Sequence, residues 1–96
     1  MIFVCSGKSM LPTFPKLGLI SVKKSKTYKI NDIVSLKTLD KKFHCHRITK
    51  IDSVVVSTKG DNLDQQWYEI DVPVENIEGI TKLIFPRTKY RESDVR

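Results

Sequence analysis

Short apolar runs recur along this chain, and their spacing is that of strands rather than of a long helix. Residues 19–23 (LISVK) and 33–37 (IVSLK) alternate between apolar and polar positions, while residues 2–5 (IFVC) are continuously apolar. Strict alternation is typical of a strand with one buried face. The predicted strands are residues 2–5, 19–23, 33–37, 43–51, 54–57 and 77–85.

Turn-forming residues separate these runs. Asn31-Asp32 precedes one strand, Asp52-Ser53 links a predicted hairpin, and the cluster at residues 59–62 (KGDN) breaks the chain again. Residues 63–69 could form a loop or one helical turn. Gly79 predicts a bulge or bend in the final strand, and Pro86 ends it.

Many short strands in a short chain predict an all-β fold: a compact, mostly antiparallel sheet or partly closed barrel with little helix. The length of 96 residues suits one domain, which we expect over residues 1–86. The charged residues 87–96 are expected to form a flexible tail. No window approaches the roughly 18 apolar residues of a membrane span, and the start, MIFVCSGK, lacks the features of a signal peptide.

The net charge of +6 is unevenly distributed. Residues 1–50 carry eleven Lys and Arg against two acids, and residues 51–96 carry six against nine. Such asymmetry can mark an anionic partner. However, the lysines are scattered, and aromatic residues that could stack on bases are few, which argues against a nucleic-acid platform.

Cys5 and Cys45 form no CxxC motif and cannot hold a zinc ion by themselves. They could pair if their strands are neighbours, but the state that we expect is two buried free thiols.

In the stretch CSGKSMLPTF, the residues around Ser9 are of types that hold a side-chain hydroxyl in one position. Gly7 precedes Ser9 by two residues and Pro12 follows it by three. Glycine permits backbone angles that other residues resist, and proline fixes one. A serine held in this way needs a neighbouring base before it can act as a nucleophile.

The two histidines of the chain, His44 and His46, would share one face of a predicted strand. His46 could then serve as the base for Ser9. His-x-His is also a common metal pair, but a metal needs a third ligand, such as Asp61, Asp64 or Cys5, and nothing in the sequence fixes one. We therefore expect no metal and no cofactor.

The pentapeptide Thr58-Lys59-Gly60-Asp61-Asn62 is a third candidate element. It could be simply a hairpin end, in which Gly and Asn supply turn angles. Alternatively, Asp61 or Asp64 could orient His46 or hold the backbone of the serine loop.

SGKSMLPTF, CHRI and TKGDN, in this order, resemble the signature boxes of type I signal peptidases, which are serine proteases that cleave leader segments after small residues. The likeness is closest to the mitochondrial inner membrane peptidase branch, and it spans nearly the whole chain. It implies that Ser9 attacks, that His46 takes its proton and that Asp61 orients His46, with Asp64 as the alternative.

The chain departs from that branch at the base. The branch has a lysine directly before an arginine, where this chain has His46 before Arg47, as in the archaeal and endoplasmic-reticulum branch. Many members also carry a serine two residues before the nucleophile, where this chain has Gly7. The oxyanion would then rest on the backbone N–H of Ser9. Gly18-Leu19 replaces the usual Gly-Asp.

The resemblance implies an extended precursor peptide as substrate, paired along a strand edge. Gly7, Met10 and Pro12 are expected to contribute to substrate binding. The family's amino-terminal membrane anchor is absent from this sequence, so we expect a longer parent protein, a membrane-anchored partner or direct membrane association. A histidine base, with a reference pKa of about 6.5, would give activity that rises as the imidazole loses its proton.

Two other functions fit parts of the sequence. A non-catalytic binding module on a peptidase-like scaffold would explain the lysine-rich first half, with binding that weakens in salt. A self-cleaving domain of the LexA type also uses a serine on a β scaffold, but no Ala-Gly or similar cleavage segment precedes Ser9.

Overall fold

The computed structural model describes residues 1–37, 43–64 and 67–86. Within these ranges the chain forms seven strands and one 3-10 turn, η1 (Val74–Asn76). The strands are β1 (Ile2–Ser6), β2 (Leu17–Lys23), β3 (Ile33–Lys37), β4 (Phe43–Asp52), β5 (Val55–Lys59), β6 (Tyr68–Pro73) and β7 (Ile77–Phe85).

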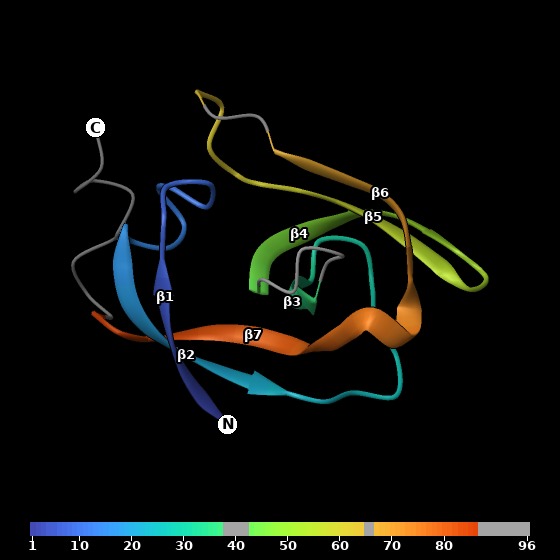
Figure 1. The fold of residues 1–96 in the computed structure, drawn as a ribbon, viewed down its shortest axis with the longest axis horizontal. Coiled ribbons are helices and arrows are strands. Elements are labelled where there is room, and N and C mark those ends of the chain that lie inside the picture. The colour runs from blue at the N-terminus through green and yellow to red at the C-terminus, as the bar shows by residue number, and fades with distance from the viewer. Residues whose placement is uncertain (38–42, 65–66, 87–96) are drawn as a thin grey trace.

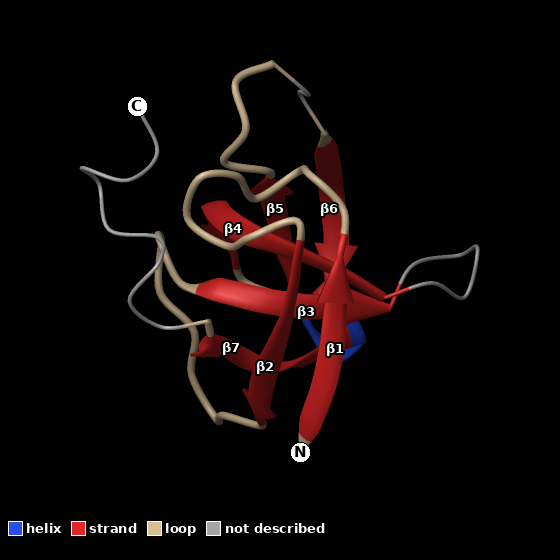
Figure 2. Cartoon of the chain, turned by 90° about the vertical axis from the view of Figure 1, so that its left-hand side faces the viewer, coloured by secondary structure: helices blue, strands red, loops and turns tan. Residues whose placement is uncertain are grey.

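All seven strands belong to one antiparallel sheet in the order β1-β2-β7-β3-β4-β5-β6. The sheet curls into a half-barrel, with β1 and β2 at one end and β4 to β6 at the other (Figure 1). The strands β1 and β6 are its two edges. Figure 2 shows the loop that follows β1 rising toward the ends of β4, β5 and β6. The predicted all-β fold is confirmed.

The core has two parts because the central strands are buried on both faces. Val34, Ser35 and Leu36 of β3 are all buried in succession, which explains the apolar character of this strand. One cluster consists of Val34, Leu36, Ile48, Val56 and Ile77. The second consists of Met10, Phe14, Ile20 and Val22, with Phe3, Cys5, Ile33, Cys45 and Leu83 packed against it.

The bounds of β3 and β7 agree with the predicted strands, and four others agree to within two residues. The predicted irregularity near Gly79 is present: the register between β3 and β7 shifts between the pairs Ser35–Gly79 and Leu36–Ile77, which leaves Glu78 as the extra residue.

The sequence-based prediction for residues 63–69 was wrong in its second half. Tyr68 and Glu69 begin β6, an edge strand that pairs with β5. Residues 65–66 and the predicted tail, 87–96, lie outside the described residues. No helix in the described part of the chain is long and apolar enough to cross a membrane.

Candidate active site

Ser9 lies in a tight loop that follows β1. Gly7 has a φ of 113°, and its N–H donates to the carbonyl of Lys16 at 2.9 Å. A positive φ of this kind favours glycine. The loop then returns to the core, where Met10 and Phe14 are only 3% and 4% exposed. The buried side chains of Met10 and Phe14 on one side, and the end of β1 on the other, therefore fix the position of Ser9.

His46 is the buried partner of Ser9. Its side chain extends from β4 on the same face as Ile48, and the residue is 1% exposed. His46 Nε2 lies 3.1 Å from Ser9 Oγ, and His46 Nδ1 lies 2.5 Å from Oε1 of Glu69. The structure therefore brings together the two residues that the sequence suggested as nucleophile and base.

Glu69 lies on β6 and contacts His46 across β5. Thr58 of β5, its register partner, donates a second hydrogen bond to Oε1 at 2.6 Å. Burial opposes ionisation of Glu69, but the hydrogen bonds from His46 and Thr58 outweigh it and hold the pKa of this carboxyl below its usual value.

An ionised Glu69 can only accept hydrogen bonds, so the proton of a neutral His46 sits on Nδ1. Nε2 is then left as the acceptor that faces the Ser9 hydroxyl. This is the arrangement of a serine, histidine and carboxylate triad, in which the acid fixes the tautomer of the base.

The acid beside His46 is Glu69 and not Asp61, which corrects the expectation from the sequence. Asp61 accepts hydrogen bonds from Arg47 Nε at 2.8 Å, from Arg47 Nη2 at 2.7 Å and from Thr13 Oγ1 at 2.5 Å. Arg47 follows His46 on β4, so its side chain leaves from the opposite face, and its guanidinium engages both oxygens of Asp61.

Burial opposes ionisation of Asp61, but Arg47 and Thr13 keep its pKa below the usual value, and Asp61 in turn raises the pKa of Arg47. The alternative acid, Asp64, is exposed, and its N–H donates to Asn62 Oδ1. Both aspartates therefore lie in the loop after β5, and the acid that contacts His46 is Glu69.

Glu69 was missed because the sequence search for an acid concentrated on the Gly60 turn. One signal was available: in YEIDVP the β-branched residues Ile70 and Val72 recur with a period of two, which is typical of a strand.

The segment Gly60-Asp61-Asn62 holds the serine loop from outside. The backbone N–H of Asn62 donates to the carbonyl of Ser9 at 2.8 Å, and its side-chain amide donates to the carbonyl of Lys8 at 2.8 Å. A Cβ at Gly60 would lie 2.5 Å from the Ser9 carbonyl oxygen. The sequence suggested Asp61 or Asp64 for this role, but the residue that holds the backbone of the serine loop is Asn62.

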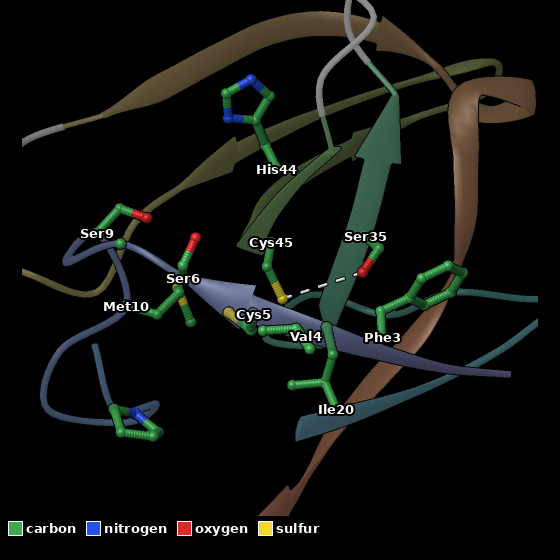
Figure 3. Close-up of a pocket in the computed structure, with 12 residues that line it drawn as sticks. Phe3, Val4, Cys5, Ser6, Ser9, Met10, Ile20, Ser35, His44 and Cys45 are labelled. Carbon is green, nitrogen blue, oxygen red and sulfur yellow. Dashed lines mark hydrogen bonds between the residues drawn. The ribbon is translucent and has the colours of Figure 1, made fainter. Parts of the chain in front are cut away.

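A cavity of about 220 Å³ opens beside Ser9. It runs between β1 and the β3–β4 pair, with Ser9 near one end and Phe3 near the other (Figure 3). Of the expected substrate-binding residues, Gly7 and Met10 line the cavity, whereas Pro12 is exposed on the turn and does not. The lining residues are Phe3, Val4, Cys5, Ser6, Gly7, Ser9, Met10, Pro15, Ile20, Ser35, His44 and Cys45.

Cys5 and Cys45 are free thiols that meet in this cavity, and both are half-buried rather than buried. A hydrogen bond with Cys45 lowers the pKa of Cys5 to about 7, although burial opposes this. The same bond, together with burial, raises the pKa of Cys45. Cys5 is therefore the more reactive of the two thiols.

The strand β1 has an open edge next to the cavity. Gly7 donates to Lys16 and Met1 accepts from Val22, at the two ends of the β1–β2 ladder. Hydrogen-bonded pairs alternate along an antiparallel ladder, so every second residue of β1 directs its N–H and C=O away from β2. These residues are Ile2, Val4 and Ser6.

Comparison of the chain with protein-family models, with curated proteins and with solved structures finds no match.

Proposed function

We propose that this chain is a serine endopeptidase of the signal-peptidase type, with Ser9 as nucleophile, His46 as general base and Glu69 as the residue that orients the base. The observation that carries the proposal is the continuous chain of contacts from Ser9 Oγ through both ring nitrogens of His46 to Glu69. A buried histidine that joins a hydroxyl to an ionised carboxylate is the arrangement that activates serine.

In the proposed reaction, Ser9 Oγ attacks the scissile carbonyl while its proton moves to His46 Nε2. The imidazolium is stabilised by Glu69, and the oxyanion is stabilised by the N–H of Ser9. His46 then donates the proton to the leaving amine, which releases the first product and leaves an acyl ester on Ser9. Water, deprotonated by His46, hydrolyses the ester and restores the hydroxyl.

The substrate would bind as an extended strand on the open edge of β1. Its backbone would pair with the outward groups of Val4 and Ser6, and its side chains would alternate between the cavity and solvent. At about 220 Å³ the cavity is smaller than the roughly 300–1,000 Å³ of a typical ligand pocket. This size supports small side chains near the cleavage site, as in leader segments.

The proposal is tested with the purified chain and a fluorogenic peptide that carries small residues at the first and third positions before the scissile bond. Ser9→Ala and His46→Ala are each expected to lower kcat/KM by about 10³-fold or more, and the double variant should be no worse than either, because the residues act as a unit. Asp64→Asn, an exposed acid outside the contact chain, is the matched control. Full activity of folded Ser9→Ala would falsify the proposal.

A further inference from the structure

The His-x-His pair of β4 is completed by an acid from β6. His44 and His46 have ring centroids 5.9 Å apart and planes tilted by 33°. Together with Glu69 they offer three ligand atoms that all lie within 4.8 Å of one another. The sequence provided no third ligand for this pair, and the structure does.

We propose that His44, His46 and Glu69 bind a zinc ion, and that zinc reversibly inhibits the peptidase. Two imidazoles and one carboxylate form a frequent zinc ligand set, with water in the fourth position. Ligand atoms about 2.1 Å from one ion lie at most about 4.2 Å apart, so a small rotation of the side chains brings all three into range.

The electrostatics of the site favour a divalent cation. Oε1 of Glu69 is already the acceptor that faces both His46 Nδ1 and Thr58 Oγ1, so it offers a ligand oxygen directed at the histidine. The side chain of Glu69 is 10% exposed and that of His46 is 1% exposed, so a bound ion would be well shielded from water. Zinc bound at His46 Nδ1 would displace the proton that lies between this nitrogen and Glu69, and the proton would move to Nε2 of the same ring.

Inhibition follows from the two nitrogens of one imidazole ring. If zinc binds Nε2 of His46, that nitrogen can no longer accept a proton from Ser9. If zinc binds Nδ1, the remaining proton of the neutral ring sits on Nε2, which again cannot accept. Either mode removes the base, so the inhibition rests on the proposed function, whereas zinc binding itself does not.

The cavity beside Ser9 offers zinc a competing pair of ligands. Cys5 and Cys45 both line it together with His44, and thiolates are strong zinc ligands. The two sites differ in their spectra, because a cobalt ion bound to thiolate shows intense near-ultraviolet charge-transfer absorption and a cobalt ion bound to nitrogen and oxygen does not.

Binding is measured first, without any substrate. Trp67 is the single tryptophan of the chain, and its ring stacks on His44 at 5.9 Å and 23°. Its fluorescence should therefore change as ZnCl₂ is added. His44→Gln and Glu69→Gln are each expected to weaken zinc binding, measured by calorimetry, by about 10-fold or more. The double variant Cys5→Ala/Cys45→Ala should bind as the unsubstituted chain does, and so should Asp71→Asn, which removes an exposed acid of β6.

Equal zinc affinity in His44→Gln, or thiolate absorption with Co²⁺, would overturn the site. Inhibition is then measured as the zinc concentration that halves each variant's own rate. It should be reversible with a chelator and should rise by about 10-fold or more in His44→Gln. If the chain binds zinc at these residues but cleaves no peptide, the proposed function fails and the site stands. If it cleaves peptide and His44→Gln is inhibited equally, the inhibition proposal fails.

Discussion

Gly60 lies so close to the backbone of Ser9 that a residue with a side chain would collide with it. An added Cβ would be 2.5 Å from the Ser9 carbonyl oxygen and 3.1 Å from Ser9 Cβ. The nearest atom belongs to the backbone, which cannot rotate away as a side chain can. The distance between Ser9 Oγ and His46 Nε2 therefore depends on the absence of a side chain at Gly60.

Gly60→Ala is expected to displace Ser9 and lower kcat by about 10²-fold, and to lower the free energy of unfolding by about 1–3 kcal/mol. Peptide cleavage and urea unfolding measure the two effects. The control is Lys59→Ala, which removes the ammonium 5.6 Å from the Tyr68 ring without touching Ser9. Unchanged kcat in folded Gly60→Ala would show that the contact does not position the nucleophile.

The sequence identified the site residues that stand within short motifs. It did not identify the residue that only the tertiary fold brings to the site. Ser9 and His46 stand within recognisable short motifs. The partner of His46 depends on which strand lies beside β5, and that strand is separated from His46 by the turn that contains Asp61. Asp61 was a reasonable candidate by type, but Arg47 offers a charged two-donor contact that the sequence did not rank.

The strand β1 combines an inner edge bonded to β2 with an outer edge that is open. The N–H of Val4 points to the open side, and the residue is 66% exposed. Edge strands tolerate proline where the lost donor faces away from the sheet. A substitution can therefore remove one substrate-pairing group and leave the β1–β2 ladder intact.

Val4→Pro is expected to raise KM for an extended peptide by about 5-fold or more, since one hydrogen bond contributes roughly 1 kcal/mol. The thermal midpoint should change little. Val4→Ala keeps the N–H and trims the side chain, and thereby separates the loss of backbone pairing from the loss of apolar contact. If both variants raise KM equally, the substrate does not pair with this edge.

Strands rich in apolar residues were predicted, and β6, whose apolar residues alternate with charged ones, was missed. β3 and β7 carry strong apolar patterns and were found with their observed bounds. β6 has Glu69 and Asp71 between its apolar residues, and most of its residues are exposed, so its period-two pattern is only weakly apolar. β6 is a strand because it pairs with β5, and the local sequence of a segment does not specify which strand it pairs with.

The order of the strands in the sheet could not be predicted from the sequence. An antiparallel sheet was expected, but nothing in the local pattern indicates that β7 would insert between β2 and β3. This insertion curls the sheet and sets the serine loop against β4. Two carboxylates then stabilise the β4–β6 end of the sheet, Glu69 by contacting His46 and Asp61 by contacting Arg47. Asp61 also accepts a hydrogen bond from Thr13 of the serine loop.

The free energy of unfolding should therefore depend on pH through the ionisation of Glu69. Because the pKa of Glu69 in the folded chain is lower than its ordinary value of 4.5, the unfolded chain binds this proton first as the pH falls. The stabilisation is present above pH 4.5 and is lost as the pH falls through the folded-state pKa. Glu69→Gln should lower the free energy of unfolding by about 1–3 kcal/mol at pH 7, and the difference should shrink toward pH 3.

Urea unfolding at a series of pH values measures this difference. Asp64→Asn, whose acid is exposed, should follow the unsubstituted chain throughout. If the difference in free energy of unfolding between Glu69→Gln and the unsubstituted chain is the same at every pH, the charge of Glu69 is not its cause.

The central position of β7 has a consequence for the chain during its synthesis. Among the described residues, the backbone ladder joins β1 and β2 to the other strands only through β7, which follows all of them in the sequence. Ser9 lies in the loop between β1 and β2, whereas His46 lies on β4 and Glu69 on β6. A ribosome-bound chain that has not yet extruded residue 85 cannot complete this ladder, so Ser9 and His46 should come together only after translation has passed that point.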